Sequence, residues 1–430
     1  MIQTIKNAWK VPELRSKILF TLLVILLYRL GANIFVPFLN ADSVEATLST
    51  MGGLFDYMNL LSGGAFAQGT VFALNVSPYI TSSIVIQLLT VALPPLERWS
   101  KDGEAGRKKI SALTRVVTVA LALVTAVGYT MLLDSYSLLT RNDAFAYAVI
   151  IACFCAGSSI IMWLAEKINE FGIGNGISMI LFANILARGT TAVSSVWGMT
   201  FTAQGFSAWG LVKSILSVAI TLAIIVMIIW FTESERRIPI QYAKRQVGRK
   251  MYGGQSSNLP LKMNMAGVMP VIFASSIASI PATIATFITN KENWFYKFAN
   301  DWFNYDTVAY LIVYIVMILL FSYFYIMISF NPVEVANNIR NQGGSVPGIR
   351  PGKPTSDYIT RILGRITTLG AIFLAFIAGF PMLINIIFKG DFAGIAFGGT
   401  SMLIVVGVAL ETFRSMESQL AMRNYKGFLD

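Results

Sequence analysis

Ten apolar runs of bilayer-spanning length constrain the fold of this 430-residue chain more than any other feature. They are Ile18–Phe38, Val71–Leu93, Leu113–Leu133, Ala144–Leu164, Ile177–Val196, Leu211–Phe231, Val268–Ile288, Val308–Phe330, Ile366–Phe388 and Ile395–Phe413. Runs of about 20 apolar residues predict transmembrane helices. The mean hydropathy of +0.64 and the 13% of charged residues are likewise typical of an integral membrane protein. Because the first run leads directly into a full span, we expect no cleaved signal peptide.

Lys and Arg residues are concentrated in every second connection between the runs. The N-terminal segment is basic, the connection 39–70 has no Lys or Arg, and the connection 94–112 is basic again. This bias predicts that both termini are cytoplasmic and that the number of spans is even. An all-α fold with two inverted five-helix halves, 1–200 and 201–430, is then permitted by the topology, although no sequence repeat between the halves is visible.

The stretch Leu54–Leu93 is divided into a short apolar segment and a full span. Leu54–Ala67 is too short to cross a bilayer and is interrupted by Ser62-Gly63-Gly64, so we predict a half-helix that enters the membrane and returns. Irregular backbone is not tolerated against lipid, so this re-entrant half-helix must lie in a cavity among other helices. The following span contains polar residues such as Asn75 and Gln87. Together these features indicate a blocked passage through a helix bundle.

The residue types that usually carry chemistry are scarce. The chain has no histidine, which removes the commonest general base and metal ligand. Cys153 and Cys155 point to different faces of one predicted helix, so we expect neither a disulfide nor a metal site. Charged residues within the spans are scarce: Arg29 lies in the first span and Glu411 near the end of the last, and we interpret Arg29 as a snorkelling or helix-bridging residue. We expect no cofactor.

Two other classes of membrane protein were weighed against these residues. A secondary transporter could share the topology, but the mid-membrane carboxylates that ion coupling usually needs are missing. An intramembrane enzyme would need a nucleophile with its base or a metal set, and neither is visible. A transporter would saturate with a small solute and an enzyme would turn one over, whereas a channel subunit would purify with small membrane partners.

Two long connections on the basic side stand out. In the connection 232–266, the alternation of apolar and polar residues over Ile238–Val247 predicts a short hairpin. In the connection 331–365, Asn331 is predicted to cap a helix over Pro332–Asn341, and a Pro/Gly-rich tip presents Arg350. Basic residues in such loops often only fix the orientation. Their length instead favours a docking platform for a motor, an acidic protein or RNA.

Several of these segments resemble the SecY family of pore subunits of bacterial Sec protein-conducting channels. The resemblance covers nearly the whole chain in unbroken order. The motifs that carry it are GGAFAQGTVFALNVSPYITSSIVIQLL, KDGEAGRKKI, GIGNGIS, YAKRQVGRKMYGGQSSNLPLKMNMAGVMPVIFASSI, FNPVEVANN, VPGIRPGKPT and FGGTSMLIVV. Val76 and Leu181 stand where isoleucine is common in the family, which preserves the apolar chemistry.

The resemblance implies two five-helix halves around an hourglass pore in the bacterial plasma membrane. It implies that the half-helix 54–67 is a plug and that a lateral gate opens between the second and seventh spans. The implied pore ring is Val76, Ile80, Ile84, Ile177, Leu181, Ile272 and Ile404. The implied central plug residues are Leu60, Leu61, Ser62, Gly63 and Gly64, and the gate residues are Thr81, Ser82, Ser275, Ser276 and Ile280.

The spacing of the ring residues agrees with this implication. Val76, Ile80 and Ile84 recur every four residues and therefore lie on one helix face, and Ile177 and Leu181 repeat the interval. From the sequence alone, each isoleucine taken singly is better explained as an ordinary lipid-facing or packing residue. Small polar residues at the proposed gate would face each other across the two helices, in contacts of about 0.6 kcal/mol each.

The resemblance also implies partners. SecE would clamp the two halves, and SecG would lie at the side. The SecA ATPase or the ribosome, including its RNA, would dock on the cytoplasmic loops through Arg237, Lys244, Arg245, Arg249, Lys250 and Arg350. Signal peptides, nascent chains and membrane lipids would meet at the gate.

Overall fold

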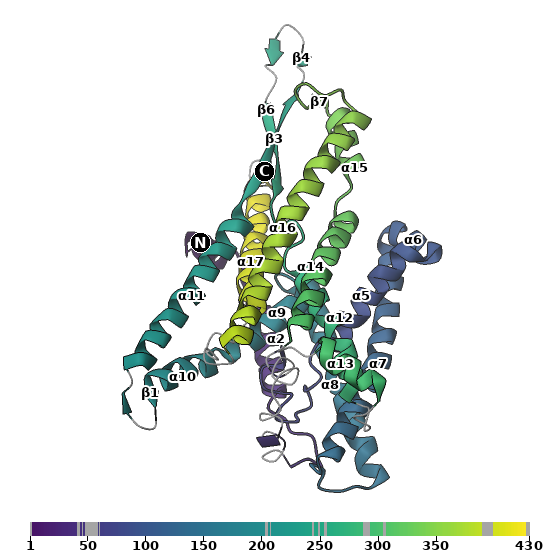
Figure 1. Cartoon of the computed structure of the whole chain (residues 1–430). Coiled ribbons are helices and arrows are strands. Elements are labelled where there is room, and N and C mark those ends of the chain that lie inside the picture. The colour runs from purple at the N-terminus through teal and green to yellow at the C-terminus, as the bar shows by residue number, and fades with distance from the viewer. Residues whose placement is uncertain are drawn as a thin grey trace.

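The structure is a computed structural model that describes residues 2–40, 44, 46–47, 59, 61–202, 205–206, 208–242, 245–247, 250–252, 256–286, 293–303, 307–388 and 399–426. Long helices form the body of the molecule, and a narrow β-hairpin extends from one end (Figure 1). The helices are α1 (Ile2–Lys10), α2 (Pro12–Gly31), α5 (Ser77–Ala92), α6 (Pro94–Lys101), α7 (Gly103–Ser135), α8 (Ala144–Phe171), α9 (Gly176–Ala187), α10 (Gly189–Thr200), α11 (Ala208–Glu233), α12 (Met269–Thr286), α13 (Trp294–Phe303), α14 (Val308–Ser329), α15 (Pro332–Asn341), α16 (Lys353–Phe388) and α17 (Gly399–Lys426). The strands are β1 (Phe201–Thr202), β2 (Gly205–Phe206), β3 (Glu235–Tyr242), β4 (Arg245–Val247), β5 (Lys250–Tyr252), β6 (Ser256–Lys262) and β7 (Gly344–Ser345).

Each predicted apolar run coincides with a helix, although the lengths vary. Among the described residues, the segments containing α7, α8, α11, α14 and α16 are long and apolar enough to cross a membrane. Helix α5 qualifies only together with α6, from which it is bent by 100°. The remaining runs fall on α2, α9 and α10, α12 and α17, which are shorter or more polar. A helical fold with several membrane-spanning helices is confirmed, and the number ten stays a prediction.

Two runs differ from the predicted single helices. Helix α2, which corresponds to the first run, ends at Gly31, where an added Cβ would lie 2.2 Å from the ring of Phe72. Beyond it, Phe35 forms an isolated antiparallel β-bridge with Thr70. The fifth run is divided at Arg188 into α9 and α10, and α10 begins with Gly189, a poor helix former. The interruption at Gly31 lies against Phe72, in the segment that follows the predicted half-helix.

The predicted half-helix 54–67 falls partly outside the described residues, and Leu60 is among those that the structure leaves out. Asn59, Leu61 and Ser62 are helical. Gly63 and Gly64 then adopt φ angles of 65° and 100°, a left-handed conformation that ends a helix at low cost to glycine. The chain continues in turns to Val76 and enters α5 at Ser77.

The two long loops form one structure at the end of the bundle. Strand β3 pairs with β6 in antiparallel register from Glu235↔Lys262 to Gln241↔Ser256, and β7 of the other loop pairs with β3 at Gln241↔Ser345. The predicted helix after Asn331 is confirmed, because α15 begins at Pro332 and the Asn331 side chain accepts hydrogen bonds from the amides of Val333 and Glu334. Ile238, Ile240, Ile339 and Val346 share an apolar core beneath this sheet.

The largest apolar core lies among α2, α5, α8, α9, α12, α14, α16 and α17, in the middle of the molecule. A second core joins α7 and α8 to the turns that follow the half-helix, including Phe66 and Leu74. Gly157 of α8 permits this contact, since a Cβ there would lie 1.9 Å from the carbonyl oxygen of Val71. The segment before α5 is therefore held against α8 by close backbone packing.

Candidate functional site

All seven residues of the predicted pore ring belong to the central apolar core or pack against it. Val76, Ile80, Ile84, Leu181, Ile272 and Ile404 are buried, and Ile177 is partly buried against them. They come from α5 and the residue before it, α9, α12 and α17. These elements lie far apart in the sequence, from Val76 to Ile404. The tertiary structure thus brings together positions that the sequence analysis related only by resemblance and helical spacing.

The described part of the predicted plug lies against this cluster. The Leu61 side chain packs on the central core, and Ser62 is 1% exposed. The Ser62 hydroxyl donates to the Asn59 carbonyl and accepts from the Phe66 amide, and the Asn59 side chain accepts from the Ala67 amide. The segment therefore has internal hydrogen bonds that fold it into a compact turn beside the ring residues.

Polar side chains from four other parts of the chain bind the backbone carbonyls of this turn, and one of them, the Tyr129 hydroxyl of α7, donates to the Phe66 carbonyl at 2.6 Å. The amides of Asn75 and Asn184 both donate to the Leu61 carbonyl oxygen, at 2.7 and 2.8 Å. The Arg29 guanidinium donates to the carbonyl of Gly63 at 3.4 Å and to that of Ala183, in the last turn of α9, at 2.8 Å. The helix-bridging interpretation of Arg29 is confirmed, and the residues it bridges include the predicted plug.

The predicted gate helices α5 and α12 are in contact, and their hydroxyl groups bond mainly within their own helices. Thr81 donates to the Ser77 carbonyl, and Ser275 and Ser276 both donate to the Ile272 carbonyl. The Ser82 hydroxyl is turned toward α7, where it donates to the Thr114 carbonyl at 2.7 Å. Ile280 is half-buried on α12.

The predicted docking residues lie on the hairpin and the adjoining tip. Arg237 is exposed on β3 and pairs with Glu235 on the same strand at 2.6 Å. Arg245 and Lys250 belong to the paired strands β4 and β5, whereas Lys244 and Arg249 lie outside the described residues. In Figure 1 the end of the hairpin that carries β4 lies beyond the helices, whereas Ile238 and Ile240 of β3 pack in the core beneath the sheet.

Arg350 is exposed on a tip whose backbone is fixed at both ends. Val346 is buried in the core beneath the sheet, and the Ile349 amide donates to the Val346 carbonyl at 3.0 Å. The Thr355 hydroxyl donates to the Arg350 carbonyl at 2.9 Å. The tip thus presents the guanidinium to solvent from a rigid backbone, as its Pro/Gly composition predicts.

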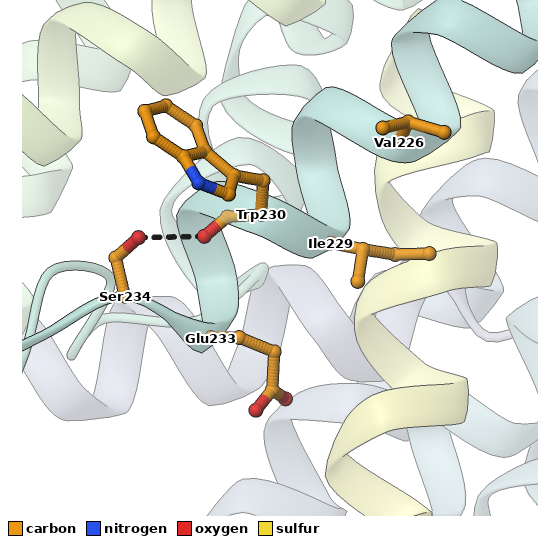
Figure 2. Close-up of a pocket in the computed structure, with 5 residues that line it drawn as sticks. All are labelled: Val226, Ile229, Trp230, Glu233 and Ser234. Atoms are coloured by element: carbon orange, nitrogen blue, oxygen red, sulfur yellow. Dashed lines mark hydrogen bonds between the residues drawn. The ribbon is translucent and has the colours of Figure 1, made fainter.

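One surface groove lies away from the ring. It has a volume of about 550 Å³ and is lined by Val226, Ile229, Trp230, Glu233 and Ser234 at the end of α11 (Figure 2). Trp230 is 72% exposed, and the Ser234 hydroxyl donates to its carbonyl. Glu233 pairs with Arg414 of α17 at 2.8 Å. The groove is open and mostly apolar, which suits lipid or a neighbouring chain and provides no convergent polar groups for catalysis.

Sequence reasoning missed the polar residues around the plug turn. Tyr28, Asn59 and Asn184 carry no motif signal and lie within or beside apolar stretches. One signal was available, because burying an amide in a membrane helix without a hydrogen-bond partner is unfavourable. Asn184 in an otherwise apolar run therefore indicates a contact with another element. The partner itself could not be deduced from the sequence.

The chain is similar to a known family over most of its length. The family model described as SecY matches residues 70–413. The protein translocase subunits SecY of Streptomyces galbus and Streptomyces coelicolor are each 42% identical over 442 residues, covering 100% of both chains. That of Mycobacterium bovis is 41% identical over 453 residues with the same coverage.

Solved structures with the same fold are more distant in sequence. A structure of a protein-conducting channel has a TM-score of 0.63 at 17% identity, with 96% of each chain covered. A structure concerned with the plug domain of SecY, which is described as stabilising that channel's closed state, has a TM-score of 0.63 at 18% identity and the same coverage. Sec61 in a canine ribosome–channel complex has a TM-score of 0.60 at 17% identity, with 96% of each chain covered.

Proposed function

Because the chain belongs to the SecY family, we propose that it forms the central pore of a protein translocation channel. Its full-length relatives are named protein translocase subunits, and its fold is that of protein-conducting channels. Unfolded secretory proteins would pass through the middle of the molecule, and transmembrane helices would leave sideways into lipid between α5 and α12.

The observation that carries this proposal is the cluster of seven aliphatic side chains from α5, α9, α12 and α17. Aliphatic side chains offer water no hydrogen bond, so a narrow neck that they surround stays dry and resists ions. They also have no directional bonds that a passing polypeptide would have to break. A ring of this kind would close around a chain of any sequence and seal again after its passage.

Two further contacts support a closed resting state. Leu61 packs on the central apolar core to which the ring residues belong, as expected of a plug. Helices α5 and α12 remain in contact along the proposed lateral exit. Displacing the plug and separating these two helices would open the path across the membrane and the path into lipid, respectively.

The two long loops, which are joined by the pairing of β3 with β7, support a docking role for the end of the molecule that carries β3, β6, β7 and α15. Their shared sheet and core hold Arg237 and Arg350 on one platform, both exposed. An arginine at fixed geometry binds carboxylate or phosphate groups by two parallel hydrogen bonds. We propose that this platform receives a SecA-type motor or the ribosome on the cytoplasmic side, and that SecE and SecG complete the channel.

The main test changes the polarity of the ring. Replacing Ile80→Asn together with Ile404→Asn should make the closed channel conduct ions, because asparagine supplies donors and an acceptor that hold water in the neck. Single-channel current in planar bilayers measures the effect. A matched control is Leu222→Asn on α11, which is 57% exposed and distant from the ring. Equal, near-zero current for the double variant and the parent would contradict a pore at these positions.

The docking proposal has a separate test. Arg350→Glu should block motor-driven export into membrane vesicles while leaving the assembly of the channel subunits intact, because charge reversal removes a contact and adds repulsion. Lys353→Glu, a neighbouring exposed reversal at the start of α16, is the control and should reduce export less. Normal export by the Arg350 variant would exclude this role for the tip.

A further inference from the structure

At the plug turn, the backbone carbonyls of Leu61 and Gly63 accept hydrogen bonds from three side chains in other parts of the molecule. Arg29 comes from the last turn of α2, Asn75 from the turn before α5, and Asn184 from the last turn of α9. Each donates to a backbone carbonyl of Leu61 or Gly63. We propose that Arg29, Asn75 and Asn184 form a polar latch that holds the plug closed and sets the threshold for its release. This inference rests on the proposed role of the segment as a plug.

The position of Arg29 has a physical cause in the helix ends that meet there. The last carbonyls of a helix lack partners within the helix and carry partial negative charge. Arg29 donates to the Ala183 and Asn184 carbonyls at the end of α9, and to the Gly63 carbonyl just after the helical residues of the plug. One guanidinium therefore interacts with two helix ends at once, and these carbonyl contacts explain how a half-buried cation is accommodated there.

The two amides form a connected pair. The Asn184 amide donates both to the Leu61 carbonyl and to the Asn75 side-chain oxygen, and the Tyr28 hydroxyl donates to that same oxygen at 3.3 Å. If the plug leaves, the bond between Asn75 and Asn184 remains available, so both side chains keep a partner. The latch can therefore exist in a closed and a released state without leaving all of its buried polar groups unpaired.

Gly63 shows how closely the latch approaches the plug. A Cβ at this position would lie 2.7 Å from a guanidinium nitrogen of Arg29 and 3.1 Å from the Asn184 Cα. Its φ of +65° also disfavours any side chain. Because the latch residues bind backbone carbonyls of the plug, substitutions of the outer plug side chains should change the release of the plug less than substitutions of the three latch residues.

The test measures the resting open fraction of the assembled channel in planar bilayers. Asn75→Gly removes one amide while keeping a residue that tolerates the observed φ of 52°, and Asn184→Ala removes the other in a helix-compatible way. Each should raise the open fraction about tenfold, in the range expected for the loss of one or two hydrogen bonds. Arg29→Lys, which keeps the charge but loses the planar fork, should give a smaller increase.

Three comparisons make the result specific. Asn33→Ala is the control, because the Asn33 amide donates to the Arg29 carbonyl and is exposed, away from the plug contacts. Each latch variant is also combined with deletion of residues 57–65, where it should cause no further opening. A tenfold increase that persists in the deleted channel, or no increase with the plug present, would overturn the latch.

The plug itself is judged by the deletion alone. A deleted channel that stays as closed as the parent would overturn the proposed plug and the latch with it. A deleted channel that leaks, combined with silent latch variants, would overturn the latch only. Thermal unfolding and co-purification of the partner subunits identify any variant that has simply lost its fold. If the other variants are lost in this way, the open fraction of Asn75→Gly, in which glycine tolerates the backbone conformation, tests the latch.

Discussion

The proposed plug turn and the proposed gate interface both place small polar groups between helices, but they use these groups in different ways. At the plug, Asn75 and Asn184 donate across elements to one carbonyl, that of Leu61. At the gate, Ser275 and Ser276 donate to the Ile272 carbonyl on their own helix. The plug is therefore held by directional bonds, whereas the α5–α12 contact depends on packing.

This difference has a mechanical consequence. Breaking a directional bond between buried groups leaves each unpaired until a new partner is found, which costs roughly 1–3 kcal/mol per group. Hydroxyls that are satisfied within their own helices lose nothing when the helices separate. We therefore expect the proposed gate to open gradually into lipid, which is as apolar as the packed helices, and the proposed plug to release in one step.

The largest expected effect comes from adding a covalent bond where the gate has only packing. Thr81→Cys with Ile280→Cys, in a background with Cys153→Ser and Cys155→Ser, should form a disulfide across α5 and α12 under oxidising conditions. Transport of secretory proteins into vesicles should then be almost abolished and should return on reduction. Failure of the pair to cross-link, with each single cysteine still accessible to a thiol reagent, would contradict the assigned gate.

A smaller effect is expected from disturbing the backbone packing on the plug side. Gly157→Val would place a Cβ 1.9 Å from the Val71 carbonyl oxygen, so α8 or the segment before α5 must shift. Overpacking of this kind costs about 1–3 kcal/mol. Thermal unfolding of the purified channel measures the loss. Gly198→Ala on α10, where an added Cβ meets nothing within 4 Å, is the matched control and should be neutral or stabilising.

The smallest effect is expected from removing gate hydroxyls. Ser275→Ala and Ser276→Ala each delete a bond within α12, so stability should change by no more than about 0.5 kcal/mol and the resting conductance should stay at the level of the parent. Ser82→Ala is a useful comparison, because the Ser82 hydroxyl donates to the Thr114 carbonyl of another helix, α7. A gate that opens readily after either α12 substitution would show that hydroxyl bonds cross the interface after all.

Local features of the fold could be predicted because their causes lie within a few residues. Asn331 and Pro332 fix the start of α15. The alternation over Ile238–Val247 predicts a short hairpin, and the structure has a strand there, β3, but its partner strand β6 lies beyond the predicted range. The apolar runs fall on helices for the same reason, since hydropathy is a property of the segment itself. Even here, boundaries moved where another element intervened, as at Gly31 against Phe72.

The sequence by itself determined that this chain is a helical membrane protein with a broken apolar segment, aliphatic positions at helical spacing and two basic loops. The tertiary structure decided which of these meet. Only the fold joins β3 to β7, about 100 residues apart, turns Ser82 toward α7, and brings Arg29 to the carbonyls of Gly63 and Ala183. The physical reason is that a buried polar group must find a partner, and no sequence pattern states where along the chain that partner lies.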